Sequence, residues 1–193
     1  MTMAWMAVFL LVLALVAIGL IAQGVSLYNG LVQVKHQVDQ AWSNIDVLLK
    51  QRHDELPKLI DAVKGYLTHE RELLQSVTAL RTRAQAIASG EGRVEAEQAL
   101  SQGVSKLLAV AESYPTLRAS EVFIDLQQRI SSLEEQIAHR REFYNAAVNI
   151  NNVRMEQFPD LLLASMVGLL RKPLFEATEP ERSDVEVGTR LVG

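Results

Sequence analysis

The chain has 193 residues, with 19 Lys and Arg against 23 Asp and Glu and a net charge of −4. Without a surplus of basic residues to neutralise phosphates, nucleic acid is excluded as an expected partner. The sequence contains no cysteine, which excludes disulfides, thiolate chemistry and cysteine-based zinc sites. Long stretches rich in Ala, Leu, Gln, Glu and Arg separate the prolines and favour helices. We therefore predict an all-α protein.

The first 25 residues predict a transmembrane anchor. Met3 to Ala22 carry no charge, and the first charged side chain is Lys35. Twenty helical residues at about 1.5 Å each span roughly the 30 Å hydrocarbon core. A cleaved signal peptide is the alternative, but the segment lacks its positive start and the apolar run is long. Residues expected to span the membrane are Met3, Trp5, Phe9, Leu13, Val16, Leu20 and Ala22.

The flanking charge predicts the orientation of this anchor. Basic residues close to a membrane span tend to lie on its cytoplasmic side. Here the basic residue near the span is Lys35, which follows it. This position of the positive charge predicts that the N-terminus lies outside and the helical domain lies in the cytoplasm.

Beyond the anchor, apolar residues at steps of three and four predict a helix from Leu27 to about Arg52-His53. Asp54 is expected to cap a second helix, with Pro57 in its first turn, where the missing N–H costs little. This second helix is expected to reach about Ala88. Trp42 shares the apolar stripe of the first helix, so we expect it to be largely buried.

The remaining breaks predict two more helices. Gly90 and Gly92 indicate a loop at 89–92, and Tyr114-Pro115 stops the third helix because the residue before proline avoids the helical region. A fourth helix is expected from about Ser120 to 155. Four long amphipathic helices with short connections favour an antiparallel four-helix bundle. The expected domains are an anchor at 1–25, a bundle at 26–157, a short apolar helix at 158–173 and an acidic flexible tail at 174–193.

The short apolar helix is the most apolar segment outside the anchor. Its uncharged run, Leu161 to Leu170, is too short to span a bilayer. Asp160 is expected at its N-terminus and Arg171-Lys172 at its C-terminus. It either caps the end of the bundle or rests on the membrane surface, and both alternatives place it beside the first helix near Tyr28. Residues named for an interfacial contact are Leu162, Met166, Leu169, Arg171 and Lys172.

No constellation of residues predicts catalysis. His69-Glu70 on the second helix lacks the second histidine of a zinc protease motif. No Glu-x-x-His pair suits a di-iron bundle. Arg140-Arg141 with Glu134-Glu135 is expected to form a solvated helix face, and Gly65 is expected in the middle of a helix, where it permits close packing. We expect no enzyme activity, no metal and no cofactor.

The segment YNGLVQVKHQVDQAWSNIDVLLKQRHDELPKLIDAVKGYLTHE at 28–70 resembles the N-terminal signature of the LemA family. AESYPTLRAS at 111–120 is similar to the second motif of that family, the run with Ile137, Arg141, Tyr144 and Asn145 to its third, and Phe158-Pro159 to its fourth. The departures from the family pattern are Lys35 in place of Arg, Glu55 in place of an aliphatic residue, and Asn151-Asn152 in place of a Tyr-Asn pair.

The resemblance implies an N-terminal membrane helix followed by a four-helix antiparallel bundle in a bacterial envelope, and it implies no enzymatic activity. We therefore predict a single-pass scaffold or adaptor of the bacterial cytoplasmic (inner) membrane. Expected partners are membrane lipids and other envelope or membrane proteins, with homo-oligomerisation left open. The alternative is a membrane-tethered ligand-sensing or signalling bundle.

Overall fold

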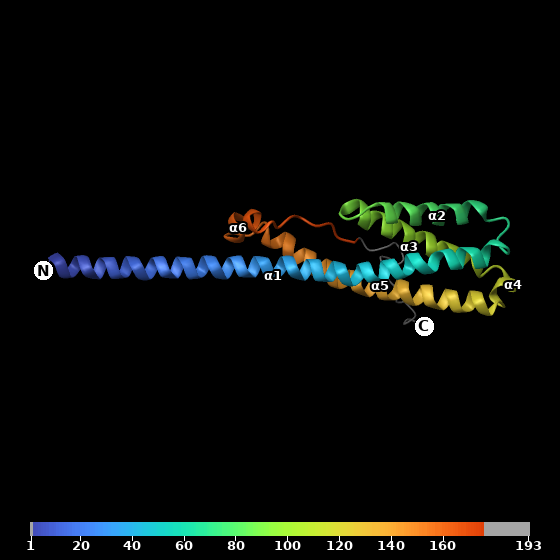
Figure 1. The fold of residues 1–193 in the computed structure, drawn as a ribbon, viewed down its shortest axis with the longest axis horizontal. Coiled ribbons are helices and arrows are strands. Elements are labelled where there is room, and N and C mark those ends of the chain that lie inside the picture. Colours follow the sequence, from blue (N-terminus) through green and yellow to red (C-terminus); the bar gives the residue numbers. More distant parts are fainter. Residues whose placement is uncertain (1, 176–193) are drawn as a thin grey trace, which may run out of the picture. The chain divides into compact units, whose positions relative to one another are not determined.

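The structure, a computed structural model, describes residues 2–175, and these form helices joined by turns without any strand (Figure 1). The all-α prediction is therefore confirmed, including a long apolar helix at the N-terminus. The predicted acidic tail lies almost wholly outside the described residues. The helices are α1 (Thr2–Lys64), α2 (Arg71–Ala86), α3 (Glu91–Ala111), α4 (Pro115–Arg118), α5 (Glu121–Arg154) and α6 (Asp160–Val167).

The chain divides into two compact units that cut across α1 and α5. Among the described residues, unit 1 comprises 2–46 and 142–172, and unit 2 comprises 47–141 and 173–175. Each unit has its own buried apolar residues, so each is described separately.

Unit 1 is built on the apolar stripe of α1. Leu31, Val34, Val38 and Ile45 are buried at steps of three, four and seven, as one face of a helix requires. From α5, Tyr144 is buried, and its ring centroid lies 5.5 Å from that of Trp42. Trp42 itself is of intermediate burial, so most of its side chain is covered, as predicted, although it is not fully buried. Its indole lies at the edge of the apolar stripe, with one side covered by the tyrosine ring.

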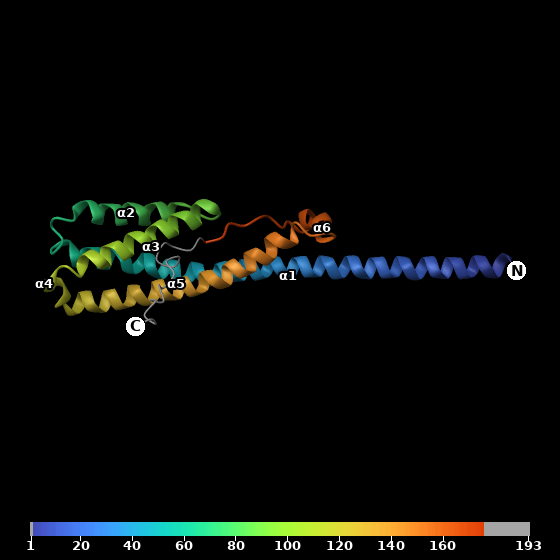
Figure 2. The ribbon, with the colours of Figure 1, turned by 180° about the vertical axis from the view of Figure 1, so that it is seen from behind.

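Unit 2 has a larger apolar core, which draws residues from α1, α2, α3 and α5. Helices α2 and α3 lie side by side, joined by the short turn before Gly90 (Figure 2). Their close approach depends on Gly103 of α3, because a Cβ there would come within 3.0 Å of the Leu80 Cδ1 atom of α2. The turn at Gly90 has a φ of 89°, a left-handed conformation that glycine adopts without steric cost.

The predicted boundary between the first two bundle helices is wrong. No break occurs at Asp54, and α1 continues to Lys64 with Pro57 inside it. A proline in a helix interior removes the hydrogen bond to the carbonyl four residues earlier, here that of His53. The Arg81 Nε atom of α2 donates to this carbonyl at 2.9 Å. The orphaned carbonyl therefore has a partner, which explains how the helix tolerates the proline.

The shift of this boundary moves two residues that the sequence placed within a helix. Gly65 and His69 lie in the turns that connect α1 to α2. Both are exposed, and a Cβ at Gly65 would meet nothing within 4 Å. Gly65 therefore does not permit close packing, and it ends a helix instead.

The short helix α6 ends earlier than predicted. Gly168 follows its last residue with a φ of 70°, and the Leu169 N–H donates to the Ala164 carbonyl at 3.0 Å, which is a common glycine-dependent helix stop. Arg171 and Lys172 consequently lie beyond the helix and do not form its last turn. The predicted position of α6 is confirmed within unit 1, because Ala164 and Leu169 form a buried cluster with Leu31 of α1.

Candidate functional site

An ionic network lies inside unit 2 and is centred on Arg52 of α1. This guanidinium is completely buried. Its Nη2 atom donates to Glu97 Oε2 of α3 at 2.5 Å, and its Nη1 atom donates to Glu134 Oε1 of α5 at 2.8 Å. The planar guanidinium of arginine presents separate N–H groups to the two carboxylates in a fixed geometry, which the compact ammonium of lysine does not offer. Arg52 therefore joins three helices through charge-assisted hydrogen bonds.

Glu97 receives cationic or polar donors on both oxygens. Besides Arg52, its Oε1 atom lies 3.0 Å from His53 Nε2 and 2.7 Å from Arg93 Nη2. Burial by itself would raise the pKa of this carboxyl. The hydrogen bond from His53 and the charges of Arg52, His53 and Arg93 outweigh burial and leave the pKa of Glu97 below its usual value. The carboxylate is therefore held in its ionised form.

Ser101 connects this network to a third arginine. Its hydroxyl oxygen accepts from Arg52 Nη1 at 2.6 Å and from Arg141 Nη2 at 2.9 Å, and its hydroxyl group donates to Glu134 Oε2 at 2.8 Å. The guanidinium of Arg141 also lies over the Phe175 ring, 4.9 Å from its centroid, a cation–π contact. The prediction of a solvated face is wrong for Arg141 and Glu134, while Arg140 and Glu135 are exposed as expected.

The network suits a structural role better than a catalytic one. Its central groups are closed off from solvent, so a substrate would reach them only if the helices separated. Ser101 lacks the geometry of an activated nucleophile, because its proton goes to a glutamate whose charge Arg52 already neutralises. A buried network of this kind costs desolvation and repays it only when its members are well paired.

Arg93 extends the network to the turn between α2 and α3. Its Nη1 atom donates to the carbonyls of Ala84 and Ile87 at 2.8 and 2.9 Å. These carbonyls lie at the end of α2, where no helical N–H remains to bond them. The same side chain thus caps α2 and neutralises Glu97.

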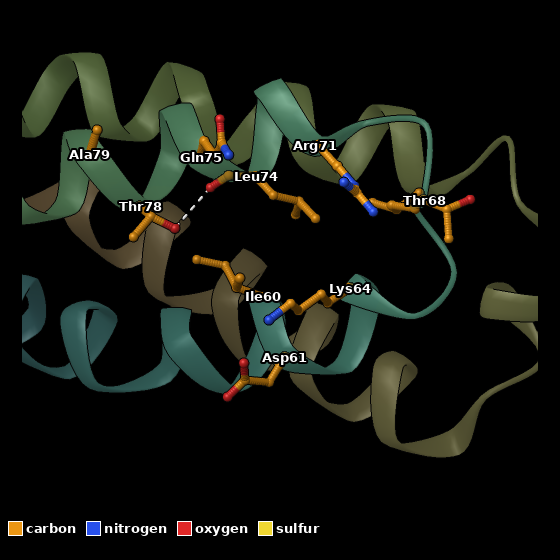
Figure 3. A pocket seen from close by; sticks show the side chains of 10 residues that line it. Ile60, Asp61, Lys64, Thr68, Arg71, Leu74, Gln75, Thr78 and Ala79 are labelled. Carbon is orange, nitrogen blue, oxygen red and sulfur yellow. Dashed lines mark hydrogen bonds between the residues drawn. The ribbon is translucent and has the colours of Figure 1, made fainter.

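The described surface of unit 2 also carries a groove between the end of α1 and the start of α2 (Figure 3). Its volume is about 600 Å³, within the range of small-molecule sites. Ile60 and Leu74 supply apolar surface, and Lys64 of α1 and Arg71 of α2 each bring a cation to the groove (Figure 3). Asp61 lies on the α1 side. The groove can therefore accept an apolar group that carries a negative charge.

The residues predicted to span the membrane are all exposed on the first turns of α1. This helix is long and apolar enough to cross a membrane, with a mean hydropathy of 2.8 over its most apolar 18-residue window. None of that window is buried inside the protein, whereas the core helix of a soluble protein would be mostly covered. The exposed residues are Met3, Trp5, Phe9, Leu13, Val16, Leu20 and Ala22.

The residues named for an interfacial contact divide into three kinds. Leu162 and Met166 are 64% and 76% exposed on α6, whereas Leu169 is 3% exposed and packs against Leu31. The naming of Leu169 as a surface contact is therefore wrong. Arg171 forms an ion pair with Glu156, and Lys172 is held by its backbone, which exchanges hydrogen bonds with the Asn152 side chain.

Among residues 2–175, no group of three or more histidines and carboxylates is placed to hold a metal ion. His53 lies in the ionic network, and His69 lies in an exposed turn. No cofactor site emerges from these positions.

The fold and the exposed apolar start of α1 define an all-helical protein with one candidate membrane span. The family model described as LemA family matches residues 41–188, and the chain belongs to the LemA family. It is 28% identical over 159 residues to Protein LemA of Metamycoplasma hominis, covering 82% of this chain and 73% of that protein.

More distant relatives are magnetosome proteins. The chain is 22% identical over 175 residues to Magnetosome protein MamQ 2 of Paramagnetospirillum magneticum, covering 77% of this chain and 64% of that protein. The match to MamQ of Magnetospirillum gryphiswaldense is 22% over 176 residues with the same coverage. The chain therefore spans just under two thirds of the length of these relatives.

Proposed function

We propose that this protein is a membrane-anchored helical scaffold or adaptor of the bacterial cell envelope, without catalytic activity. The observation that carries the proposal is α1, whose apolar and fully exposed start runs without a helix break into the buried stripe that begins at Leu31. One helix thus combines a surface suited to lipid with a surface suited to protein packing. The anchor lies in the cytoplasmic membrane, with the N-terminus outside and the helical domain in the cytoplasm.

The proposed architecture of the domain is an antiparallel four-helix bundle. The core of unit 2 includes Leu59 of α1, Val77 of α2, Leu100 of α3 and Ile130 of α5. Short turns connect α1 to α2 and α2 to α3, which favours antiparallel neighbours. The ionic network around Arg52 adds polar contacts among three of these four helices.

A scaffold needs a surface for its partners, and the groove between α1 and α2 is the best candidate among the described residues. Its apolar floor and the cations Lys64 and Arg71 fit an amphipathic segment that carries acidic groups. The relatives named as magnetosome proteins support a role at membranes, because their name refers to a bacterial membrane compartment.

Site-specific photocrosslinking in intact membranes tests the adaptor proposal. A benzophenone amino acid replaces Gln75, which lines the groove, and in a matched control it replaces Gln128, which is exposed on α5. We expect a discrete protein crosslink from position 75, absent from position 128 and lost with Lys64→Glu. Equal crosslinking from both positions, or none from either, would contradict a partner at this groove.

The alternative is a membrane-tethered ligand-sensing or signalling bundle. The volume of the groove supports this alternative, because it is large enough for a small molecule. Native mass spectrometry of the full chain released from membranes distinguishes the two. A small molecule retained by the purified protein and displaced by Arg71→Glu, together with the absence of protein crosslinks, would favour the ligand-sensing function.

A further inference from the structure

The segment around α6 exposes an unusual amount of apolar side-chain surface for its length. On one side of the helix, Ala164 and Leu169 are buried against Leu31. Leu163 and Val167 are partly buried against the same cluster. The other large apolar side chains of the segment face solvent, which normally costs free energy unless another surface covers them. The exposed residues are Phe158, Leu161, Leu162, Met166 and Leu170.

This segment is fixed in place and is not a loose extension of α5. The Asp160 carboxylate lies 3.2 Å from Arg154 Nη1. The Asn151 side-chain amide donates to the Leu170 carbonyl at 2.9 Å, and the Asn152 amide donates to the Lys172 carbonyl at 3.0 Å. Polar contacts thus secure both ends of the segment, so its exposed face has a defined direction relative to α1.

The segment contacts α1 immediately after the apolar start of that helix. Leu31 packs against it, and the Lys35 Nζ atom donates to the Val167 carbonyl at 3.3 Å. Val25 is the last large apolar side chain exposed before the half-exposed Tyr28. Leu31 follows Val25 by six residues, or roughly 9 Å at the helical rise. A helix of about 10 Å diameter packed there reaches the level of the lipid head groups.

Three cations lie at the C-terminal end of this segment. Arg171 and Lys172 follow α6, and Lys35 contacts its C-terminal end. Glu156 pairs with Arg171 and offsets one of these charges. Apolar side chains next to Lys and Arg are the composition expected of a helix that lies on an anionic membrane surface.

We propose that α6 lies in the head-group region of the bilayer that α1 crosses, with Phe158, Leu161, Leu162, Met166 and Leu170 inserted toward the acyl chains. The occupant of this face is lipid, and the proposal rests on the proposed membrane anchor. The protein then contacts the bilayer at two points, α1 and α6. The choice of lipid over a protein partner follows from the position of the segment beside the apolar start of α1.

The absence of cysteine from the sequence makes a direct test straightforward. Single cysteines replace Leu162 and Met166 in the full chain, carry a nitroxide spin label, and are placed one chain per lipid nanodisc containing phosphatidylglycerol. Accessibility to oxygen, which concentrates in the bilayer, is compared with accessibility to a water-soluble nickel chelate. Leu13→Cys in the apolar start of α1 is the lipid-exposed reference, and Val122→Cys, exposed on α5, is the water-exposed reference.

We expect the labels at 162 and 166 to lie within about 5–10 Å of the boundary between head groups and acyl chains, with severalfold lower nickel accessibility than at 122. Nickel accessibility equal to that at 122, while position 13 stays in lipid, would overturn the proposal and leave the anchor intact. Nickel access at position 13 would instead overturn the anchor itself. Because each disc holds one chain and no other protein except the belt protein at its rim, protection at 162 and 166 would not come from a partner protein of the cell.

A charge variant tests the cationic part of the proposal. Replacing Arg171 and Lys172 together with Gln should move the labels toward water in discs with phosphatidylglycerol and leave them unmoved in discs of phosphatidylcholine alone. The same depth in both variants and both lipids would show that the apolar side chains hold α6 without help from these charges.

Discussion

The hydrogen bond that compensates for Pro57 gives a stability prediction that can be worked out from the structure. Arg81→Met keeps an apolar side chain of similar length but removes the donor to the His53 carbonyl. A hydrogen bond from a charged donor contributes about 1.5–3 kcal/mol, and the partial exposure of this one reduces the figure to about 1–2 kcal/mol. For a protein of this size the loss lowers the melting temperature by roughly 2–8 °C.

The Pro57→Ala background separates this bond from any general effect of Arg81. An alanine at position 57 restores the backbone N–H that bonds the His53 carbonyl within α1, so Arg81→Met should then cost less by about 1 kcal/mol. Thermal unfolding of the full chain in detergent micelles, followed by circular dichroism, measures all four variants. Arg83→Met, on the exposed face of α2, controls for the loss of one positive charge. An equal loss with proline and with alanine at position 57 would refute the compensation.

Three further predictions concern the buried groups. Arg52→Met should lower the free energy of unfolding by about 3–5 kcal/mol, and Arg52→Lys, which keeps a positive charge near Glu97 and Glu134, by less; a loss below about 1 kcal/mol for Arg52→Met in urea titrations would argue against a buried bridge between two carboxylates. Folding lowers the pKa of Glu97 from 4.5, so the ionised carboxylate stabilises the fold above pH 4.5, and this contribution is lost as the pH falls through the pKa of the folded state. Glu97→Gln should therefore make the free energy of unfolding less dependent on pH in acid. Burial raises the pKa of Tyr144 to about 12, so Tyr144→Phe should remove the latest step of the ultraviolet phenol titration.

The apolar anchor and the helical stripes could be predicted because both depend on local sequence. A charge-free run before Lys35 and apolar residues at steps of three and four determine which surfaces avoid water. The ends of α5 followed from the same pattern, and the position of α6 beside α1 followed from the antiparallel order of the predicted helices. These features need no knowledge of which side chains meet across the fold.

The continuation of α1 through Pro57 could not be predicted from local signals. Asp54 and Pro57 together are typical of a helix start. Whether the chain breaks there depends on Arg81, which lies 28 positions away in sequence from the carbonyl that it bonds. A prediction from the residues around Pro57 alone cannot include a hydrogen-bond donor from another helix.

The ionic network was missed although the sequence contains a signal for it. Arg52 lies three residues after Leu49 and four before Leu56, in the middle of the apolar stripe of α1. Arg141 likewise lies between Ile137 and Tyr144 on the stripe of α5. A charge at a core position of a long helix predicts a buried partner, but the partner itself depends on how the helices align.

The buried charges also have a consequence for how the helices slide past one another. Leucines that face leucines offer similar contacts after a shift of one helical turn, about 5.4 Å. The same shift of α3 along α1 would take Glu97 away from Arg52 and His53, and it would leave ionised groups in an apolar interior. Neighbouring alignments of the helices are therefore separated by a large free-energy gap, and a single polar cluster selects one register for the whole of unit 2.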